Sequence, residues 1–224
     1  MAQFSASDSL AHRRIMVDGQ IRTYGITDLD LIDRFLAVPR ENFVGPEQVA
    51  LAWSDAAVQL QGGRTLLKPM VLAKMLQAAS LLPGDRVLDI AGGSGYGAAL
   101  MAGLATQIVA LEAGAGQAAA IAANCAALGL ANVEAVSGDL TRGAPGKAPF
   151  DVIMVEGAVE TGLEPLLAQL ANKGRLIVIR NKPGRVYGEV MRCERHGASI
   201  GERVLFEAAV QVLAGFGAAP AFAF

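Results

Sequence analysis

Hydrophobic residues follow two different rhythms along the chain, and the change falls near Asp85. Before this point, apolar residues recur close to the helical period, at Ile15, Met16, Ile21, Leu31, Ile32, Phe35 and Leu36. The segment 25–28 interrupts the pattern, and Thr27 or Asp28 is a suitable cap for a second helix. Pro39 disfavours helical geometry in the residue before it, so this helix should end there. A third, apolar helix is expected over 69–79.

After Asp85, short apolar runs alternate with helical segments. Strands are predicted at 86–90, 107–112, 133–137, 151–155, 174–180 and 207–213. Helices are predicted between them at 98–104, 117–128 and 164–170. The near-continuous Val, Ile and Leu content of the strands indicates a mostly parallel sheet that is covered on both faces. The sequence therefore predicts a doubly wound α/β fold, with an N-terminal helical and substrate-loop region over 1–80 packed on a core over 81–224 as one compact domain.

Composition narrows the classes of function. The 224 residues include 19 Lys and Arg and 21 Asp and Glu. The chain therefore lacks the excess of basic residues that is typical of domains that bind nucleic-acid phosphates, and no nucleic-acid partner is expected. No run reaches the ~20 apolar residues of a membrane span, and 1–14 is polar, so we expect a cytoplasmic protein with no membrane partner. The two cysteines and two histidines lack metal-ligand spacing, and no metal site is predicted.

Acidic residues end three successive predicted strands. Asp89 precedes a glycine-rich turn, Glu112 ends the second strand, and Asp139 follows the third. Taken singly, each could be a helix cap, a solvated loop residue or a turn former. Taken together, they lie where open α/β sheets bind ligands. The predicted cofactor-binding residues are Asp89, Ala91, Gly92, Gly93, Ser94, Gly95, Glu112, Asp139 and Leu140.

These residues favour S-adenosylmethionine over a dinucleotide. A carboxylate before the glycine turn suits the ammonium and sulfonium of S-adenosylmethionine, whereas a dinucleotide presents a pyrophosphate there. Glu112 is suited to accept the ribose hydroxyls, and Asp139 an exocyclic amine such as that of adenine, while Leu140 packs on the ring. The cofactor is thus expected to be S-adenosyl-L-methionine, with S-adenosyl-L-homocysteine as product.

Several segments resemble protein-L-isoaspartate O-methyltransferases in order and spacing. The matching residues are Arg14, Met16, Gln20, 25–28, 38–44, 62–69, 87–96, 138–139, 149–151 and 174–176. The resemblance implies the Rossmann-like fold of S-adenosylmethionine-dependent methyltransferases. It also implies methyl transfer to the carboxylate of isoaspartyl residues in damaged proteins, which makes a peptide or protein the substrate.

The chain departs from the family pattern at several positions. Within the substrate loop, where the resemblance places Thr65, Leu67 and Lys68 at the reaction site, Leu67 stands in place of the family's serine. Ala91, Leu140 and Glu156 also replace small residues, and the tail from Val204 differs. Because Leu67 offers no hydrogen bond, we expect weak or altered activity on isoaspartyl peptides. Two alternatives remain open, a different methyl acceptor and a cofactor-binding protein that acts only by contact. The oligomeric state is left open.

Overall fold

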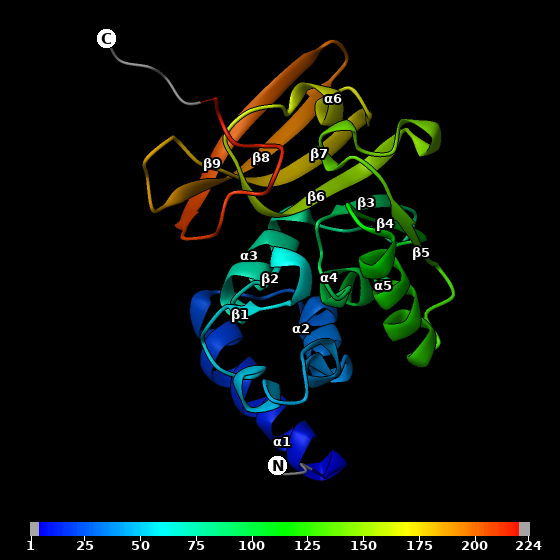
Figure 1. Ribbon diagram of the computed structural model, residues 1–224. Helices are drawn as coiled ribbons and strands as arrows, with labels where there is room; N and C mark the ends of the chain where they lie inside the picture. Colours follow the sequence, from blue (N-terminus) through cyan, green and yellow to red (C-terminus); the bar gives the residue numbers. More distant parts are fainter. Residues whose placement is uncertain (1–4, 220–224) are drawn as a thin grey trace.

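The computed structural model describes residues 5–219 and is built around a seven-stranded sheet (Figure 1). The strands are β3 (Arg86–Ile90), β4 (Gln107–Glu112), β5 (Val133–Ser137), β6 (Phe150–Val159), β7 (Leu170–Arg180), β8 (Gly188–His196) and β9 (Ser199–Ala208). They lie in the order β5-β4-β3-β6-β7-β8-β9. Strands β5 to β7 pair in parallel, and β8 and β9 extend the sheet as an antiparallel pair.

The strand order reverses at β3. From β3 the chain moves outward through β4 to β5, and it then returns to the opposite side of β3 with β6. Asp89 of β3 pairs in register with Met154 of β6, which places the carboxyl ends of these two strands together. In open parallel sheets, ligands bind outside the carboxyl ends at such a reversal. The fold thus predicts a ligand crevice between β3 and β6.

Side chains alternate between the two faces of the sheet and supply two hydrophobic clusters. Val87 of β3 belongs to the larger cluster, and its neighbour Leu88 belongs to the smaller one. The helices are α1 (Ala6–Met16), α2 (Leu29–Ala37), α3 (Pro69–Ala79), α4 (Tyr96–Met101), α5 (Ala115–Ala127) and α6 (Glu164–Leu167). The first five contribute to the larger cluster, whereas α6 packs on the other face (Figure 1). One face is therefore covered more thickly than the other.

The N-terminal helices begin and end where their residue types dictate. Asp28 caps α2, since its side chain accepts a hydrogen bond from the Leu31 amide at 3.1 Å. The helix ends at Ala37, two residues before Pro39. Both features were predicted. A two-stranded ribbon of β1 (Val58–Gln59) and β2 (Thr65–Leu66) then leads into α3.

The parallel strands match the sequence expectations and the later elements do not. Strands β3, β4 and β5 have the predicted bounds, and β6 and β7 are longer than predicted. The predicted strand 207–213 is wrong, because β9 ends at Ala208 and only Val212 forms an isolated bridge, with Ala158. Strands β8 and β9 were not predicted, and α6 is shorter than the expected 164–170. The last residues of the apolar tail, 220–224, lie outside the described part of the chain.

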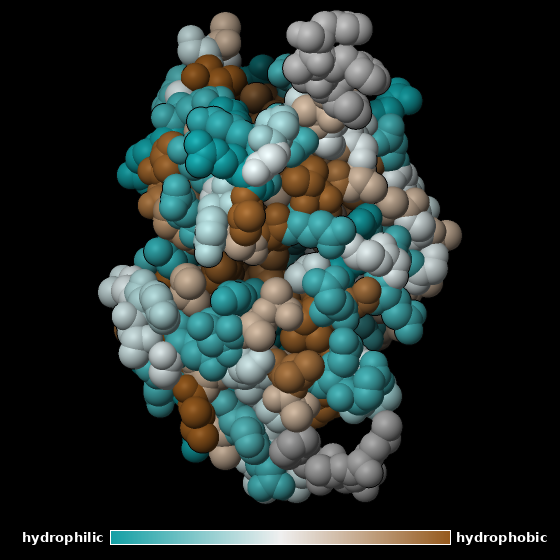
Figure 2. All heavy atoms as spheres, turned by 60° about the vertical axis from the view of Figure 1, so that its left-hand side comes forward, coloured by the Kyte–Doolittle hydropathy of each residue, from teal (hydrophilic) through white to brown (hydrophobic). Residues whose placement is uncertain are grey.

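The surface mixes polar and apolar side chains. In Figure 2, hydrophobic atoms form several separate areas between hydrophilic ones. Exposed apolar residues include Ile15 near the N-terminal end and Val186 and Tyr187 between β7 and β8. Among the described residues, no helix is long and apolar enough to cross a membrane.

Candidate active site

The glycine turn between β3 and α4 forms the floor of the crevice. Gly93 and Gly95 adopt left-handed conformations (φ 65° and 89°), and Gly95 caps α4. Ala91 also has a positive φ, of 63°, although it carries a side chain. A Cβ on Gly92 would lie 2.6 Å from Oδ2 of Asp89, so only glycine fits above this carboxylate. The turn is folded tightly around Asp89.

Glu112 is a fully paired carboxylate. Its side chain is 0% exposed and accepts hydrogen bonds from the Gly93 amide at 2.8 Å and the Ala113 amide at 3.1 Å. Arg64 completes the set, with Nε at 3.1 and 2.9 Å from the two oxygens and Nη2 at 2.9 Å from Oε2. A carboxylate has about four acceptor positions. The oxygens predicted to accept ribose hydroxyls are thus occupied by the chain itself.

Arg64 belongs to a loop, residues 60–64, that lies directly on the glycine turn. A Cβ on Gly93 would lie 2.8 Å from Cδ1 of Leu60 and 3.2 Å from Cβ of Arg64. A cavity of about 510 Å³ opens on one side of the loop, beside Gly93 and Ser94. A second cavity, of about 240 Å³, lies beside Arg64, Thr65 and Glu156. The loop divides the crevice in two.

Asp89 and Glu156 form a buried acidic pair across the strand-order reversal. Asp89 lies near the carboxyl end of β3 and is 1% exposed, and Glu156 lies within β6 and is 3% exposed. Neither oxygen of Asp89 nor Oε1 of Glu156 makes a hydrogen bond of ordinary length and angle with another described residue. Burial raises the pKa of Asp89 well above its usual range, and the neighbouring Glu156 raises it further. The backbone amide of Ala98 lowers the pKa of Asp89, but it is the weakest of the influences on that carboxyl. Burial likewise raises the pKa of Glu156, to about 7. The pair therefore keeps a proton at neutral pH.

Arg40 is the cation that faces Glu156. It is 0% exposed and donates to the carbonyl oxygens of Ala52 at 2.7 Å and Leu67 at 2.6 Å. Its guanidinium lies over the Tyr96 ring, 4.9 Å from the ring centroid. Burial lowers the pKa of Arg40, and burial raises that of Tyr96 to about 12. Arg40 thus ties the substrate loop to the first residue of α4.

The substrate-loop residues do not share one environment. Thr65 is half-buried and lines the smaller cavity together with Glu156. Lys68 is exposed at the start of α3. Leu67 is 1% exposed and belongs to the larger hydrophobic cluster. Its side chain lies in the core and does not line either crevice cavity. Thr65 is therefore the loop residue that the structure brings to the crevice.

The third acidic residue stands apart from the other two. Asp139 is exposed, and its Oδ1 accepts from the amide and hydroxyl of Thr141 at 2.9 and 2.7 Å. These hydrogen bonds lower the pKa of Asp139. Leu140 is buried in the smaller hydrophobic cluster. Asp89, Glu112 and Asp139 lie at the carboxyl ends of the neighbouring strands β3, β4 and β5, as predicted.

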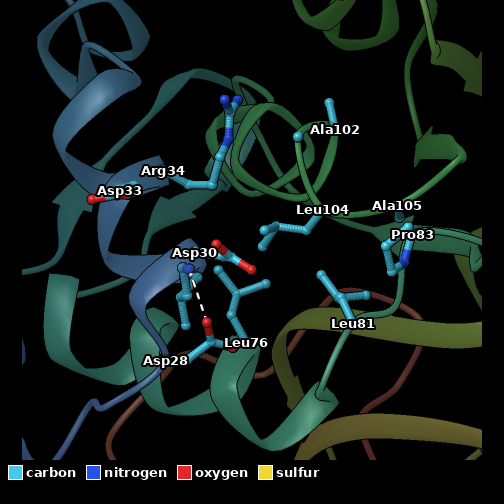
Figure 3. A pocket seen from close by; sticks show the side chains of 12 residues that line it. Asp28, Asp30, Asp33, Arg34, Leu76, Leu81, Pro83, Ala102, Leu104 and Ala105 are labelled. Carbon is cyan, nitrogen blue, oxygen red and sulfur yellow. Dashed lines mark hydrogen bonds between the residues drawn. The ribbon is translucent and has the colours of Figure 1, made fainter.

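A further pocket lies at the opposite edge of the sheet. It measures about 460 Å³ and includes Arg34, Pro83 and Ala105 in its lining (Figure 3). Pro83 and Ala105 precede β3 and β4, so this pocket is at the amino ends of the strands. Arg34 donates to the carbonyl oxygens of Ala99 at 2.9 Å and Leu100 at 3.2 Å. The pocket is remote from the predicted cofactor residues.

Sequence reasoning assigned no role to three residues that shape the crevice, Arg40, Arg64 and Glu156. Glu156 follows directly after the predicted strand 151–155. The rule that selected Asp89, Glu112 and Asp139 therefore applied to it as well. Arg40 and Arg64 gave no comparable signal, because their partners are 12 to 48 positions away in the chain. The described residues contain no group of three or more side chains that could hold a metal ion.

Comparisons with known proteins agree on one family. The family model for protein-L-isoaspartate(D-aspartate) O-methyltransferase matches residues 12–207. A protein-L-isoaspartate O-methyltransferase of Methanoregula boonei is 40% identical over 186 residues, which cover 83% of this chain and 85% of the relative. One from Methylorubrum extorquens is 40% identical over 177 residues, covering 79% and 77%.

Solved structures agree with the sequence matches. A protein-L-isoaspartate O-methyltransferase of 25% identity superposes with a TM-score of 0.79, covering 92% of this chain and 66% of that one. A Plasmodium falciparum structure described with the same activity and in complex with S-adenosyl-L-homocysteine gives 0.77 at 20% identity, covering 90% and 97%. The second match supports the fold alone. On the strength of the family match and these relatives, the chain belongs to the protein-L-isoaspartate(D-aspartate) O-methyltransferase family.

Proposed function

We propose that the protein is an S-adenosylmethionine-dependent O-methyltransferase that esterifies the carboxylate of isoaspartyl residues in damaged proteins. The observation that carries this proposal is the family match over residues 12–207, which includes both the substrate loop and the crevice. The names of the relatives favour this acceptor over a different one or over a role by contact alone. We place the activity in the cytoplasm, and the unbridged, buried Cys125 and Cys193 are consistent with a reducing compartment.

The crevice has the features that this cofactor requires. Unpartnered carboxylate oxygens of Asp89 lie beneath the glycine turn and suit a cationic ligand. The proposed binding residues are Asp89, Ala91, Gly92, Gly93, Ser94, Gly95, Glu112, Asp139 and Leu140. When bound, S-adenosylmethionine supplies an activated methyl group. Glu112 can accept a ligand hydroxyl only after Arg64 has given up part of its contact with it, so we expect the Arg64 side chain to shift when the cofactor binds.

The acceptor side needs positioning and needs no proton transfer from the chain. A carboxylate nucleophile is already ionised at neutral pH, so no general base is required. The protein contributes by holding the acceptor and excluding water. Thr65 and the exposed cation of Lys68 are the loop groups able to contact it, and Arg64 lines the same cavity as Thr65. Leu67 supports the loop from the core, where its backbone carbonyl accepts from Arg40.

A methyl-transfer assay with a matched pair of peptides tests the proposal. The protein is incubated with tritiated S-adenosylmethionine and either an isoaspartyl peptide or its aspartyl twin. We expect base-labile label, as a methyl ester, in the isoaspartyl peptide only. Equal labelling of both peptides would point to another acceptor, and cofactor binding with no transfer would support the role by contact.

A further inference from the structure

We propose that Asp89 and Glu156 form a proton-exchanging cation site, in which the cofactor's positive charge replaces a proton and S-adenosylmethionine is selected over its demethylated product. The inference rests on the proposed function in one respect, namely that the chain binds this cofactor. It adds a role for Glu156, which stands where the family has small residues.

The geometry provides a site that lacks its cation. Asp89 and Glu156 come from the two strands that flank the strand-order reversal, and both are at least nine-tenths buried. Both oxygens of Asp89 and Oε1 of Glu156 lack a hydrogen bond of ordinary geometry among the described residues. Glu156 also lines the 240 Å³ cavity, so this member of the pair borders space that a ligand can enter. Buried, unpartnered carboxylates of this kind require a counter-charge or a proton.

The charged groups in and around the pair sum to one negative charge when both of its carboxyl groups are ionised. Three ionisable groups interact with the pair directly: Glu112 from β4, Arg40 from the segment that follows α2, and Cys125 from α5. Arg64 contributes through its ion pair with Glu112. Cys125 is neutral at physiological pH, because burial raises its pKa to about 11. Three carboxylates therefore face two guanidinium groups, an imbalance of one negative charge. A proton shared by Asp89 and Glu156 removes this imbalance in the absence of ligand, and a monovalent cation can do the same.

The chemistry of the ligands decides which cation fits. The described residues provide no group of three or more metal-ligating side chains, which disfavours a metal ion. S-Adenosylmethionine carries a fixed sulfonium charge in addition to its zwitterionic amino-acid group, and the demethylated product has a neutral sulfur. A paired carboxylate site should therefore bind the first more tightly than the second. Loss of the sulfonium charge on methyl transfer would weaken the hold on the product.

Calorimetric titration of the whole chain tests this inference without measuring activity. Each ligand is titrated near pH 6 in buffers of different ionisation enthalpy, and the dependence of the observed heat on the buffer gives the number of protons exchanged. We expect S-adenosylmethionine to release close to one proton near pH 6, and we expect the release to decrease as the pH is raised and the free pair loses its proton. Binding of S-adenosylmethionine with no proton release near pH 6 would overturn the inference and leave the proposed cofactor in place.

A variant then assigns the effect to Glu156. In Glu156→Gln, which keeps the side-chain volume, we expect no proton release and roughly a tenfold loss of the preference for S-adenosylmethionine over its product. The exposed Glu164→Gln is the matched control and should behave as wild type. An unchanged preference in Glu156→Gln would also overturn the inference. If the folded wild-type protein binds neither ligand, the proposed function itself fails. The wild-type proton count needs no variant, so it decides the question even if Glu156→Gln does not fold.

Discussion

Glu112 and the Asp89–Glu156 pair are neighbouring buried acidic sites that differ in how their carboxylates are hydrogen-bonded. Glu112 is surrounded by donors from Arg64, Gly93 and Ala113. Three of the oxygens of Asp89 and Glu156 make no hydrogen bond of ordinary geometry, and burial raises the pKa of both groups. Both sites lie at the same edge of the same sheet, so location alone does not determine the state of a buried acid. The difference lies in whether the chain provides hydrogen-bond donors to the carboxylate oxygens.

The largest loss of stability is expected when the paired acid, Glu112, is removed. Glu112→Ala leaves Arg64 buried without its partner, and we expect a loss of about 3–5 kcal/mol in the free energy of unfolding. Urea denaturation at neutral pH measures it. The exposed ion pair of Glu134 with Lys147 gives the control, since Glu134→Ala should cost less than about 1 kcal/mol. Similar losses in the two variants would show that the ion pair of Glu112 with Arg64 contributes no more to stability than an exposed ion pair.

The unpaired site should be visible in the pH dependence of stability. A carboxyl group whose pKa is raised on folding binds more protons in the native state, so stability falls as the pH rises. For Glu156 the loss begins near the ordinary value of 4.5 and is complete above about 7. We expect a loss on the order of 3 kcal/mol across this window, by the usual conversion of a pKa shift. Urea midpoints measured at several pH values give the slope. A slope equal in wild type and Glu156→Gln would contradict this assignment.

Removal of Arg64 tests the role of the cation that pairs with Glu112. Arg64→Ala frees the Glu112 oxygens, so we expect S-adenosylmethionine to bind about tenfold more tightly. The same change should lower the free energy of unfolding by about 1–3 kcal/mol, less than Glu112→Ala, because Glu112 loses the hydrogen bonds from Arg64 but keeps those from the Gly93 and Ala113 amides. Titration calorimetry and urea denaturation report the two effects. Arg203→Ala, at an exposed position on β9, is the control, and an affinity equal to wild type in Arg64→Ala would mean that Arg64 does not compete with the cofactor.

The smallest effect concerns the turn that joins the two sites. Ala91 has a left-handed backbone conformation that glycine adopts at lower cost. Ala91→Gly should therefore increase the free energy of unfolding by about 1 kcal/mol. Ala122→Gly, at an exposed position inside α5, should instead decrease it by about 1 kcal/mol. Urea denaturation of both variants tests the opposite signs.

The sequence predicted the parallel strands better than the antiparallel ones for a physical reason. Strand β3 is buried along its length except at Arg86, and its buried residues other than Asp89 are apolar. Strand β8 alternates charged residues such as Arg192 and Glu194 with buried ones such as Cys193, and it lies near the edge of the sheet. The apolar runs used to identify strands do not detect such a pattern. Its detection depends on period-two alternation.

The positions of the candidate site residues could be predicted where backbone topology fixes them, and not where side-chain packing decides them. The carboxyl ends of β3, β4 and β5 brought Asp89, Glu112 and Asp139 to neighbouring positions, as expected. The ion pair of Arg64 with Glu112 spans 48 positions and depends on how loop 60–64 folds back. The direction of Leu67 likewise follows from core packing, because a leucine gains more from burial than from lining a polar crevice.

The wall of the smaller cavity has a consequence for how relatives of this protein diverge. Residues 210–214 of the tail form part of that wall, and Leu213 fits against Gly157 where a Cβ would collide with it. The match to the family model ends at residue 207, so this part of the wall lies outside the matched segment. Side-chain changes at residues 210–214 can therefore reshape the cavity without contacting the glycine turn. We expect such changes to alter which acceptors enter the smaller cavity more than they alter the fold.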